Sequence, residues 1–469
     1  MKRILAFILL VVLFTGCDDS SDSNNTFNNS TNNINNVNNS TNNVNNNNIN
    51  NTNNTNIQMA TVTGRVWGPG ADDISVLSTN HFPVPGALVA MYKGDIDAPP
   101  DGNYCNECVE LSEGIPHVFT DEQGYFSMEI PPNTTFNLLV QKGEFRRISY
   151  FISPGPGESM DLSALSGQPK NAALTLPNRH DPGSGSWTPR IAIVIGAYEK
   201  KMNVMFEALG FTYNNDHLAG ISTDGDIMHP FDPTEADLLV EDPVELARYN
   251  VIIVTCGATI NSIFDNGARN NLIQWVRNGG KLYVDDFSYD WVEQAWPEFL
   301  SWYVETPDEG GTSGVCGDGG SEGNGACNNW GQYSTAGYSE DPGLSSWLTL
   351  PEVHQGSPVE LEGAWDILHE ISPGPVGECP EVAPECHDNV LYLPPKVWMR
   401  GNAPGNHSNN PMTVSWNHWC GKVLYTVYHT HSEGYTEDPK AYELLVQEKI
   451  MMYLIMEIQT CTVPIIVQK

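Results

Sequence analysis

Hydrophobic and polar positions alternate with a short period in the first folded part of the chain. Apolar or alternating runs lie between residues 60 and 151, and turn residues separate them. The runs are residues 61–67, 87–92, 117–120, 125–130, 136–140 and 148–151. Because no helical period occurs between them, the pattern predicts an antiparallel β-sandwich of about seven short strands.

The period changes after residue 186. Long apolar runs, typical of strands buried on both faces, occupy residues 190–196, 249–257, 281–286 and 422–429. Helical spacing occurs at residues 199–209 and 268–278. A last helix is expected from Asp438, which suits the N-cap, and Pro439 at the first helical position. Its later part, residues 450–456, is apolar on all sides. Strands that alternate with helices predict an α/β domain with a parallel sheet.

The N-terminal segment has the pattern of a targeting signal followed by a tether. Lys2 and Arg3 precede an apolar run, residues 4–14, that is too short to span a bilayer. The run closes on Phe14, Thr15, Gly16 and Cys17, which resemble a bacterial lipobox. The resemblance implies cleavage before Cys17 and a lipid on its thiol, although an ordinary cleaved signal is the alternative. Asn-rich sequence then predicts a disordered tether.

These patterns predict a multi-domain chain. The expected parts are a signal peptide at residues 1–17, a tether at 18–58, a sandwich at 59–178, a linker at 179–188 and an α/β domain at 189–469. Residues 307–342 are rich in Gly, Ser and Asn, and we expect them to form an insertion within the α/β domain.

Three segments of the first part carry a family resemblance. They are residues 83–89, residues 120–127 and the run of Gly64, Arg65 and Val66. Together they resemble the carboxypeptidase regulatory-like domain, a transthyretin-like sandwich, which implies a spacer or contact module without catalysis. In the second segment, Asp121 and Gly124 predict a tight turn before the strand resumes.

Residues 249–287, taken with 421–429, resemble the class I glutamine amidotransferase-like superfamily, which has a flavodoxin-like fold and includes trehalose-utilisation-type proteins. The resemblance implies a nucleophilic Cys in a tight turn after the strand at 281–286 and a His after the last strand. Asp286 and Phe287 stand where that Cys belongs. Hydrolysis of an amide through a thioester therefore has no nucleophile at this position.

Acids and imidazoles follow the ends of two predicted strands. Asp285, Asp286, His429, His431 and Glu433 are expected to meet above the carboxyl edge of the sheet, where open α/β sheets bind ligands. Asp286, His429 and Glu433 are the candidate catalytic groups, and Asp285 and His431 are candidate ligands of a divalent cation. The alternative is that the acids cap a helix or turn while the His residues form hydrogen bonds at the rim.

Ten cysteines leave nine after Cys17, and in an exported protein we expect four disulfides. Proximity in the sequence suggests the pairs Cys105 and Cys108, Cys316 and Cys327, Cys379 and Cys386, and Cys420 and Cys461. Cys256 is then left over, and we expect it to be buried and away from His429.

The net charge limits the kinds of partner that the chain can bind. The chain has 57 acidic and 22 basic residues, a formal net charge of −35, which excludes nucleic-acid binding. Asp308, Asp318, Glu322 and Asn324 are possible calcium ligands, but they lack the spacing of an EF-hand.

Two hypotheses for function follow. The first is an extracytoplasmic lipoprotein, anchored at the outer membrane or cell surface of a bacterium, that binds a small molecule, glycan or protein without catalysis. The second is a secreted hydrolase of carbohydrate or amide, with Asp286 and His429 as acid and base or as metal ligands.

Overall fold

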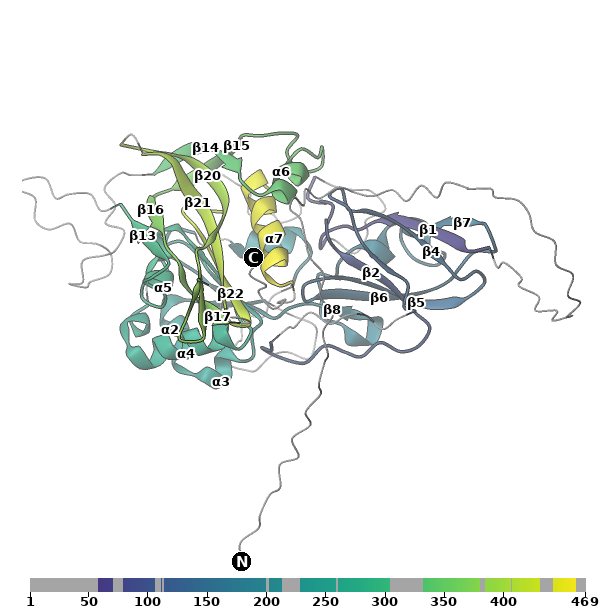
Figure 1. Cartoon of the computed structure of the whole chain (residues 1–469), viewed down its shortest axis with the longest axis horizontal. Helices are drawn as coiled ribbons and strands as arrows, with labels where there is room; N and C mark the ends of the chain where they lie inside the picture. Colours follow the sequence, from purple (N-terminus) through teal and green to yellow (C-terminus); the bar gives the residue numbers. More distant parts are fainter. Residues whose placement is uncertain are drawn as a thin grey trace, which may run out of the picture. The chain divides into compact units, whose positions relative to one another are not determined.

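The computed structural model describes residues 58–70, 79–105, 111, 114–199, 202–212, 228–258, 260–303, 332–379, 384–405, 407–430 and 442–460. The described residues belong to one compact unit, Ile57–Lys469 (Figure 1). The predicted signal peptide, including Cys17, and nearly all of the tether lie outside them. Among the helices described, none has both the length and the apolar character needed to span a bilayer.

The first part contains two sheets. One has the order β4-β1-β7 and the other the order β3-β2-β5-β6-β8. Their strands are β1 (Ala60–Arg65), β2 (Leu88–Tyr92), β3 (His117–Phe119), β4 (Tyr125–Ile130), β5 (Thr135–Lys142), β6 (Phe145–Ile152), β7 (Ser159–Asp161) and β8 (Ser186–Trp187). The six predicted runs coincide with β1 to β6. The pairing is antiparallel except between β1 and β7, and β8, inside the expected linker, pairs with β6.

The turn predicted at Asp121 is confirmed. The Oδ1 atom of Asp121 accepts hydrogen bonds from the N–H groups of Gln123 (2.9 Å) and Tyr125 (2.8 Å). Gly124 has φ +82°, a left-handed conformation that glycine adopts without a steric penalty. This turn fixes where β4 begins.

The second part is built on a mixed sheet. Its parallel strands are β9 (Ile191–Val194), β10 (Met228–Phe231), β11 (Val251–Val254), β12 (Lys281–Asp285) and β22 (Gly421–Thr426). They lie in the order β10-β9-β11-β12-β22. Numbered along the chain, this order is 2-1-3-4-5, the flavodoxin-like order. The predicted parallel sheet is therefore confirmed.

The same sheet continues with antiparallel strands that the sequence analysis did not predict. They are β21 (His407–His418), β20 (Lys396–Ala403), β14 (Tyr333–Ser339) and β15 (Val359–Ala364), which bring the described sheet to nine strands. β14 occupies part of the expected insertion, whose residues 307–331 lie outside the described ranges. Smaller sheets pair β13 (Leu300–Trp302) with β16 (Leu368–Ile371), and β19 (Val390–Leu393) with β17 (Gly374–Glu378) and β18 (Cys386–His387).

Helices lie on both sides of this sheet: in Figure 1, α2, α4 and α5 lie on one side and α7 on the other. The α-helices are α1 (Met202–Ala208), α2 (Pro233–Glu241), α3 (Pro243–Leu246), α4 (Asn266–Arg277), α5 (Asp290–Glu293), α6 (Pro342–Leu348) and α7 (Val446–Ile458). The 3-10 turns include η1 (Leu162–Ala164), η2 (Ala172–Leu174), η3 (Pro182–Ser184), η5 (Ser262–Phe264) and η6 (Asp286–Ser288). The predicted helices at 199–209 and 268–278 correspond to α1 and α4.

Helix α7 begins later than predicted. Residues 442–445 are not helical, and Asp438 and Pro439 lie outside the described residues. The Glu448 carboxyl group accepts a hydrogen bond from the N–H of Leu445 (2.7 Å) and so satisfies a backbone donor at the start of this helix. The helix is buried nearly all round, as its apolar pattern predicts.

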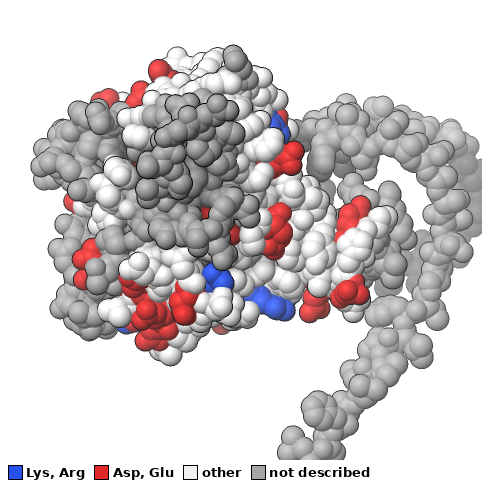
Figure 2. Space-filling model, turned by 90° about the vertical axis from the view of Figure 1, so that its left-hand side faces the viewer, with Lys and Arg blue, Asp and Glu red and all other residues white. Residues whose placement is uncertain are grey.

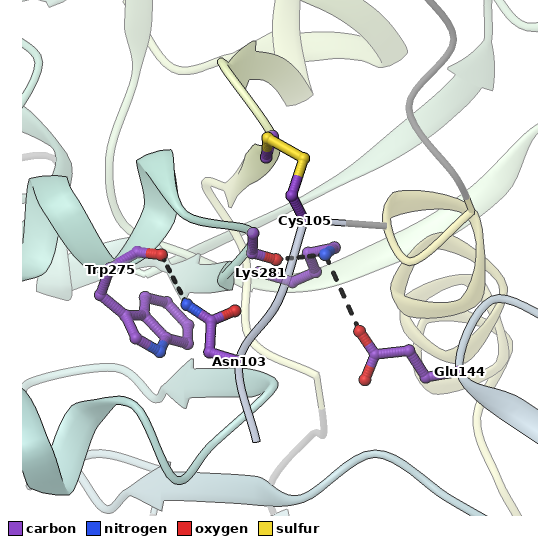
Figure 3. The surroundings of a disulfide bond; sticks show 7 residues. Asn103, Cys105, Glu144, Trp275 and Lys281 are labelled. Carbon is purple, nitrogen blue, oxygen red and sulfur yellow. Dashed lines mark hydrogen bonds and ion pairs between the residues drawn. A yellow bond between two sulfur atoms is a disulfide. The ribbon is translucent and has the colours of Figure 1, made fainter. Parts of the chain in front are cut away.

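The two parts are joined at the amino end of the parallel sheet. A disulfide links Cys105 to Cys420, with Cα atoms 5.1 Å apart, and the Asn103 side chain donates to the carbonyl of Trp275 (2.8 Å) (Figure 3). The chain at Tyr104 passes so close to Gly279 that a Cβ on this glycine would lie 1.9 Å from the Tyr104 carbonyl oxygen.

This disulfide corrects two predicted pairings. Cys105 does not pair with Cys108, nor Cys420 with Cys461, because the loop that carries Cys105 crosses the sheet edge next to Cys420. The predicted bond between Cys379 and Cys386 is confirmed. The predicted pair of Cys316 and Cys327 lies outside the described residues, as do Cys17, Cys108 and Cys461.

A buried ion pair lies beside the disulfide. Nζ of Lys281, the first residue of β12, lies 3.8 Å from a carboxylate oxygen of Glu144, and both side chains are buried (Figure 3). Burial raises the pKa of Glu144 to about 6, against the opposing effect of Lys281. Burial also lowers the pKa of Lys281. The two opposite charges lie close enough to offset part of the cost of burying each other.

The surface carries the expected excess of acid. On the face drawn in Figure 2, acidic side chains form several patches and Lys or Arg side chains are few.

Candidate functional site

Three neighbouring strands bring three different side chains together. The sheet order places β12 between β11 and β22, so their carboxyl ends lie next to one another. Cys256 follows β11, Asp286 follows β12 and His429 follows β22. Asp286 Oδ2 lies 3.1 Å from Nε2 of His429 and 3.7 Å from Sγ of Cys256, and the three atoms all lie within 4.8 Å of one another.

The prediction that Asp286 and His429 meet is therefore confirmed, whereas the expectation that Cys256 lies away from His429 is wrong. Cys256 is buried, as expected, but its strand borders the strand of Asp286. Asp286 thus contacts both residues from the central position.

Asp286 occupies a turn with unusual backbone geometry. Its φ is +42°, a left-handed conformation that costs a non-glycine residue on the order of 1 kcal/mol or more. Its Oδ1 accepts hydrogen bonds from the N–H groups of Trp365 and Asp366, each at 3.1 Å. These bonds hold the side chain and offset part of the cost of the turn.

A glycine allows the loop after β9 to approach the loop after β11. A Cβ on Gly196 would lie 2.0 Å from the carbonyl oxygen of Cys256. The N–H of Tyr198 donates to the same carbonyl (3.2 Å), and the hydroxyl of Thr255 donates to the carbonyl of Glu199 (2.8 Å). Glu199 and Tyr198 are thereby fixed beside Cys256.

Further carboxyl groups surround Asp286. Burial and the neighbouring Glu199 raise the pKa of Asp285 well above its usual value. Burial and the charge of Asp286 do the same for Asp366, whose Oδ2 accepts a hydrogen bond from the hydroxyl of Tyr425 (3.2 Å). Asp285 and Asp366 are both fully buried, and for both groups burial favours the neutral acid over the carboxylate.

The three central groups influence one another's protonation. Burial raises the pKa of Asp286, against the opposing effect of His429. Burial lowers the pKa of His429, but Asp286 outweighs this and the net direction is upward. Burial and the two nearby aspartates raise the pKa of Cys256 well above its usual value, so its thiol is neutral near pH 7.

Aromatic rings lie beside the cluster. The ring of Tyr198 stacks on Trp365 at a centroid distance of 6.3 Å and meets the edge of Phe287 at 6.0 Å. Trp365 and Phe287 are partly buried, whereas 63% of Tyr198 is exposed. Tyr198 therefore presents a ring to solvent next to buried carboxyl groups.

The remaining predicted residues divide into two groups. Asp285 adjoins Asp286 but contributes no atom to the close group of Cys256, Asp286 and His429. The candidates outside the described residues are His431, Glu433, Asp308, Asp318, Glu322 and Asn324. Glu199 and Asp366 also lie at this site, and neither is among the residues predicted from the sequence. Glu199 follows β9, so the rule that led to Asp286 applies to it as well, whereas Asp366 lies between β15 and β16 and gave no such signal.

Comparisons with known proteins found similarity only among solved structures. No family model and no curated protein matches the chain. A β-galactosidase from Bacillus circulans is 10% identical, with a TM-score of 0.25, and the match covers 51% of this chain but 28% of that one. A ThuA-like protein from Bacteroides uniformis is 14% identical (57% and 90% covered, TM-score 0.30). Another from Parabacteroides merdae is 12% identical (58% and 90% covered, TM-score 0.31). Similarities this low assign no function to the chain.

Proposed function

We propose that the chain is an extracytoplasmic lipoprotein whose α/β part binds a polyhydroxylated ligand, a glycan, at the cluster around Asp286. The observation that carries this proposal is the exposed ring of Tyr198 beside Trp365, next to buried carboxyl groups. Aromatic faces cover the apolar C–H surfaces of sugars, and carboxyl oxygens accept hydrogen bonds from sugar hydroxyls.

The proposal includes the two family assignments suggested by the sequence. The first part would be a carboxypeptidase regulatory-like sandwich that acts as a spacer, and the second an amidotransferase-like domain without its nucleophile. Asp286 stands in the turn after β12, where a carboxylate is a poor nucleophile toward an amide and repels a developing oxyanion. The groups at this turn are therefore suited to binding a ligand and not to amide hydrolysis.

A direct test compares two exposed tyrosines. Tyr198→Ala should weaken binding to neutral oligosaccharides on a glycan array and in calorimetry by about tenfold, the loss expected for one stacking ring. Tyr338→Ala, at a tyrosine 51% exposed on β14, is the matched control and should bind like the wild type. Equal binding by the wild type and both variants, or no binding to any oligosaccharide, would contradict the proposal.

A second candidate function is hydrolysis of a glycan. The 3.1 Å contact between Asp286 and His429 favours it, because an imidazole oriented by a carboxylate can act as a general acid or base toward a substrate. Release of reducing sugar by the wild type, lost in both Asp286→Asn and His429→Gln, would support hydrolysis. Binding without turnover would leave the non-catalytic function.

The lipid anchor has its own test. Cys17→Ser should move the protein from the membrane fraction to the soluble fraction, because the thiol that carries the lipid is gone. Identical detergent partitioning of the wild type and the variant would exclude the anchor.

A further inference from the structure

We infer that Cys256, Asp286 and His429 bind a zinc ion. The inference goes beyond the proposed glycan binding and does not depend on it. It rests on three observations: the distances between the donor atoms, the unsatisfied imidazole nitrogen of His429, and the lack of a Lys or Arg partner for Asp286 among the described residues.

The distances match a tetrahedral site. With zinc–ligand distances typical of proteins, tetrahedral angles separate N and O ligands by about 3.3 Å and S and O ligands by about 3.6 Å. The observed separations are 3.1 Å from Nε2 of His429 to Oδ2 of Asp286 and 3.7 Å from Sγ of Cys256 to the same oxygen. Two of the three separations therefore match a tetrahedral site, and the third, from Sγ of Cys256 to Nε2 of His429, is within 4.8 Å.

Nε2 of His429 points at the cluster but forms no hydrogen bond of good geometry there. Nε2 of His429 is buried and lacks a hydrogen bond of good geometry within the described structure, despite its short distance to Asp286. A neutral imidazole nitrogen and a carboxylate oxygen at this distance can share a metal ion, which would take the place of the proton between them. The set of one thiol, one imidazole and one carboxylate suits zinc, and it leaves a fourth position for water or a ligand oxygen.

Neighbouring groups hold the donors in place. Oδ1 of Asp286 is fixed by the N–H groups of Trp365 and Asp366, and the carbonyl of His429 accepts a hydrogen bond from Gln447 on α7 (2.6 Å). Such outer contacts orient the ligands of zinc sites. They also mean that the donors are positioned before any metal arrives.

The local charge favours a cation. Within the described residues, no Lys or Arg forms an ion pair with the carboxylate of Asp286. Zinc would compensate the carboxylate of Asp286 and would displace the proton of the Cys256 thiol, as metal ions do on binding cysteine.

The test uses the full chain, purified in detergent without a histidine tag. After dialysis against zinc and then buffer, elemental analysis should find one zinc per chain. Replacement by cobalt should give the near-ultraviolet thiolate-to-cobalt band, which Cys256→Ser should abolish. His429→Gln should weaken zinc binding by at least the roughly 10- to 100-fold loss that outer-contact changes cause.

Asp285→Asn is the matched control, because it changes a buried aspartate next to Asp286 that lies outside the proposed ligand set. It should keep both the zinc and the cobalt band. Zinc should also raise the melting temperature of the wild type and of Asp285→Asn but not of Cys256→Ser, provided circular dichroism shows all three folded. Absence of zinc and of the cobalt band in the folded wild type, or loss of zinc in Asp285→Asn with retention in Cys256→Ser, would overturn the inference.

Discussion

Strand β12 carries buried charge at both ends, and the two ends are arranged differently. At the amino end, Lys281 faces Glu144, and a disulfide between Cys105 and Cys420 closes the edge. At the carboxyl end, Asp285 and Asp286 lie near other acids, and His429 provides the opposing charge. The amino end is thus compensated by its own residues, whereas the carboxyl end carries excess acid.

This difference separates a structural end from a functional one. Opposite charges that compensate each other hold two parts of a chain together and leave nothing for a ligand. Buried acids held close together, with raised pKa values, cost stability, and such arrangements are common at binding and catalytic sites. The comparison predicts that substitutions at the amino end reduce stability, while those at the carboxyl end change pH dependence and binding.

The largest effect is expected from the disulfide at the amino end. Cys105 and Cys420 are 315 residues apart, so the chain-entropy model gives the bond on the order of 5 kcal/mol. The double variant Cys105→Ala/Cys420→Ala should lose this amount of unfolding free energy in urea titrations.

The disulfide between Cys379 and Cys386 is the internal control. Its sequence separation is 7, for which the same model gives about 2 kcal/mol. Equal losses from removing either disulfide would show that the long-range bond does not close the amino end of the sheet as described.

The paired cysteines also mark what the sequence could and could not predict. The spacing of Cys379 and Cys386 is short enough to suggest a pair, but nothing local connects Cys105 with Cys420. Similarly, continuous apolar runs predicted β9, β11, β12 and β22, whereas β21 contains Asn409, Asn410 and Pro411, which pattern rules assign to turns. The local sequence pattern therefore predicts strands that are buried on both faces better than it predicts the antiparallel strands at one side of the sheet.

The buried ion pair should give the next largest effect. Lys281→Met leaves the carboxylate of Glu144 buried without its partner, which should cost about 3 kcal/mol of unfolding free energy. The double variant Lys281→Met/Glu144→Leu should recover most of that loss, because replacement of both charges by apolar groups is often nearly neutral. A double variant no more stable than the single one would mean that the pair acts through something other than charge compensation.

At the carboxyl end, the sequence predicted part of the site. The ends of apolar strands pointed to Asp286 and His429, because parallel strands end at the same edge of a sheet. The expectation for Cys256 rests on its burial alone. The order of the strands along the chain does not show that β11 lies next to β12 in the sheet. Strand order is a property of the whole sheet, so sequence position does not determine which ends are adjacent.

The third prediction concerns the pH dependence of stability. Burial raises the pKa of Glu448, at the start of α7, to about 8 from 4.5, so between these values the folded state binds more protons than the unfolded state. The unfolding free energy therefore falls as the pH rises through this range. Between pH 6.5 and 8 the contribution of Glu448 should be about 2 kcal/mol.

Urea titrations at pH 6.5 and 8 test this prediction. Glu448→Gln should show a fall smaller by about 2 kcal/mol than that of the wild type, because the amide does not titrate. The window avoids His418, whose pKa burial lowers to about 4, since its contribution has the opposite sign and is complete near pH 6.5. A wild type that becomes more stable toward pH 8 would contradict the raised pKa of Glu448.

The smallest expected effect concerns glutamine hydrolysis, where neither the wild type nor Cys256→Ala should exceed the uncatalysed background. An amidotransferase needs a thiolate on the turn after β12, and this turn carries Asp286. Cys256 lies within reach of His429, so proximity no longer excludes it as a substitute. Its protonation does, because burial and the adjacent Asp286 and Asp285 raise the pKa of its thiol, and a neutral thiol is a poor nucleophile. Ammonia release from glutamine that disappears in Cys256→Ala but persists in a matched Cys379→Ala/Cys386→Ala variant would show that His429 activates the thiol, and the carboxyl end would then be catalytic.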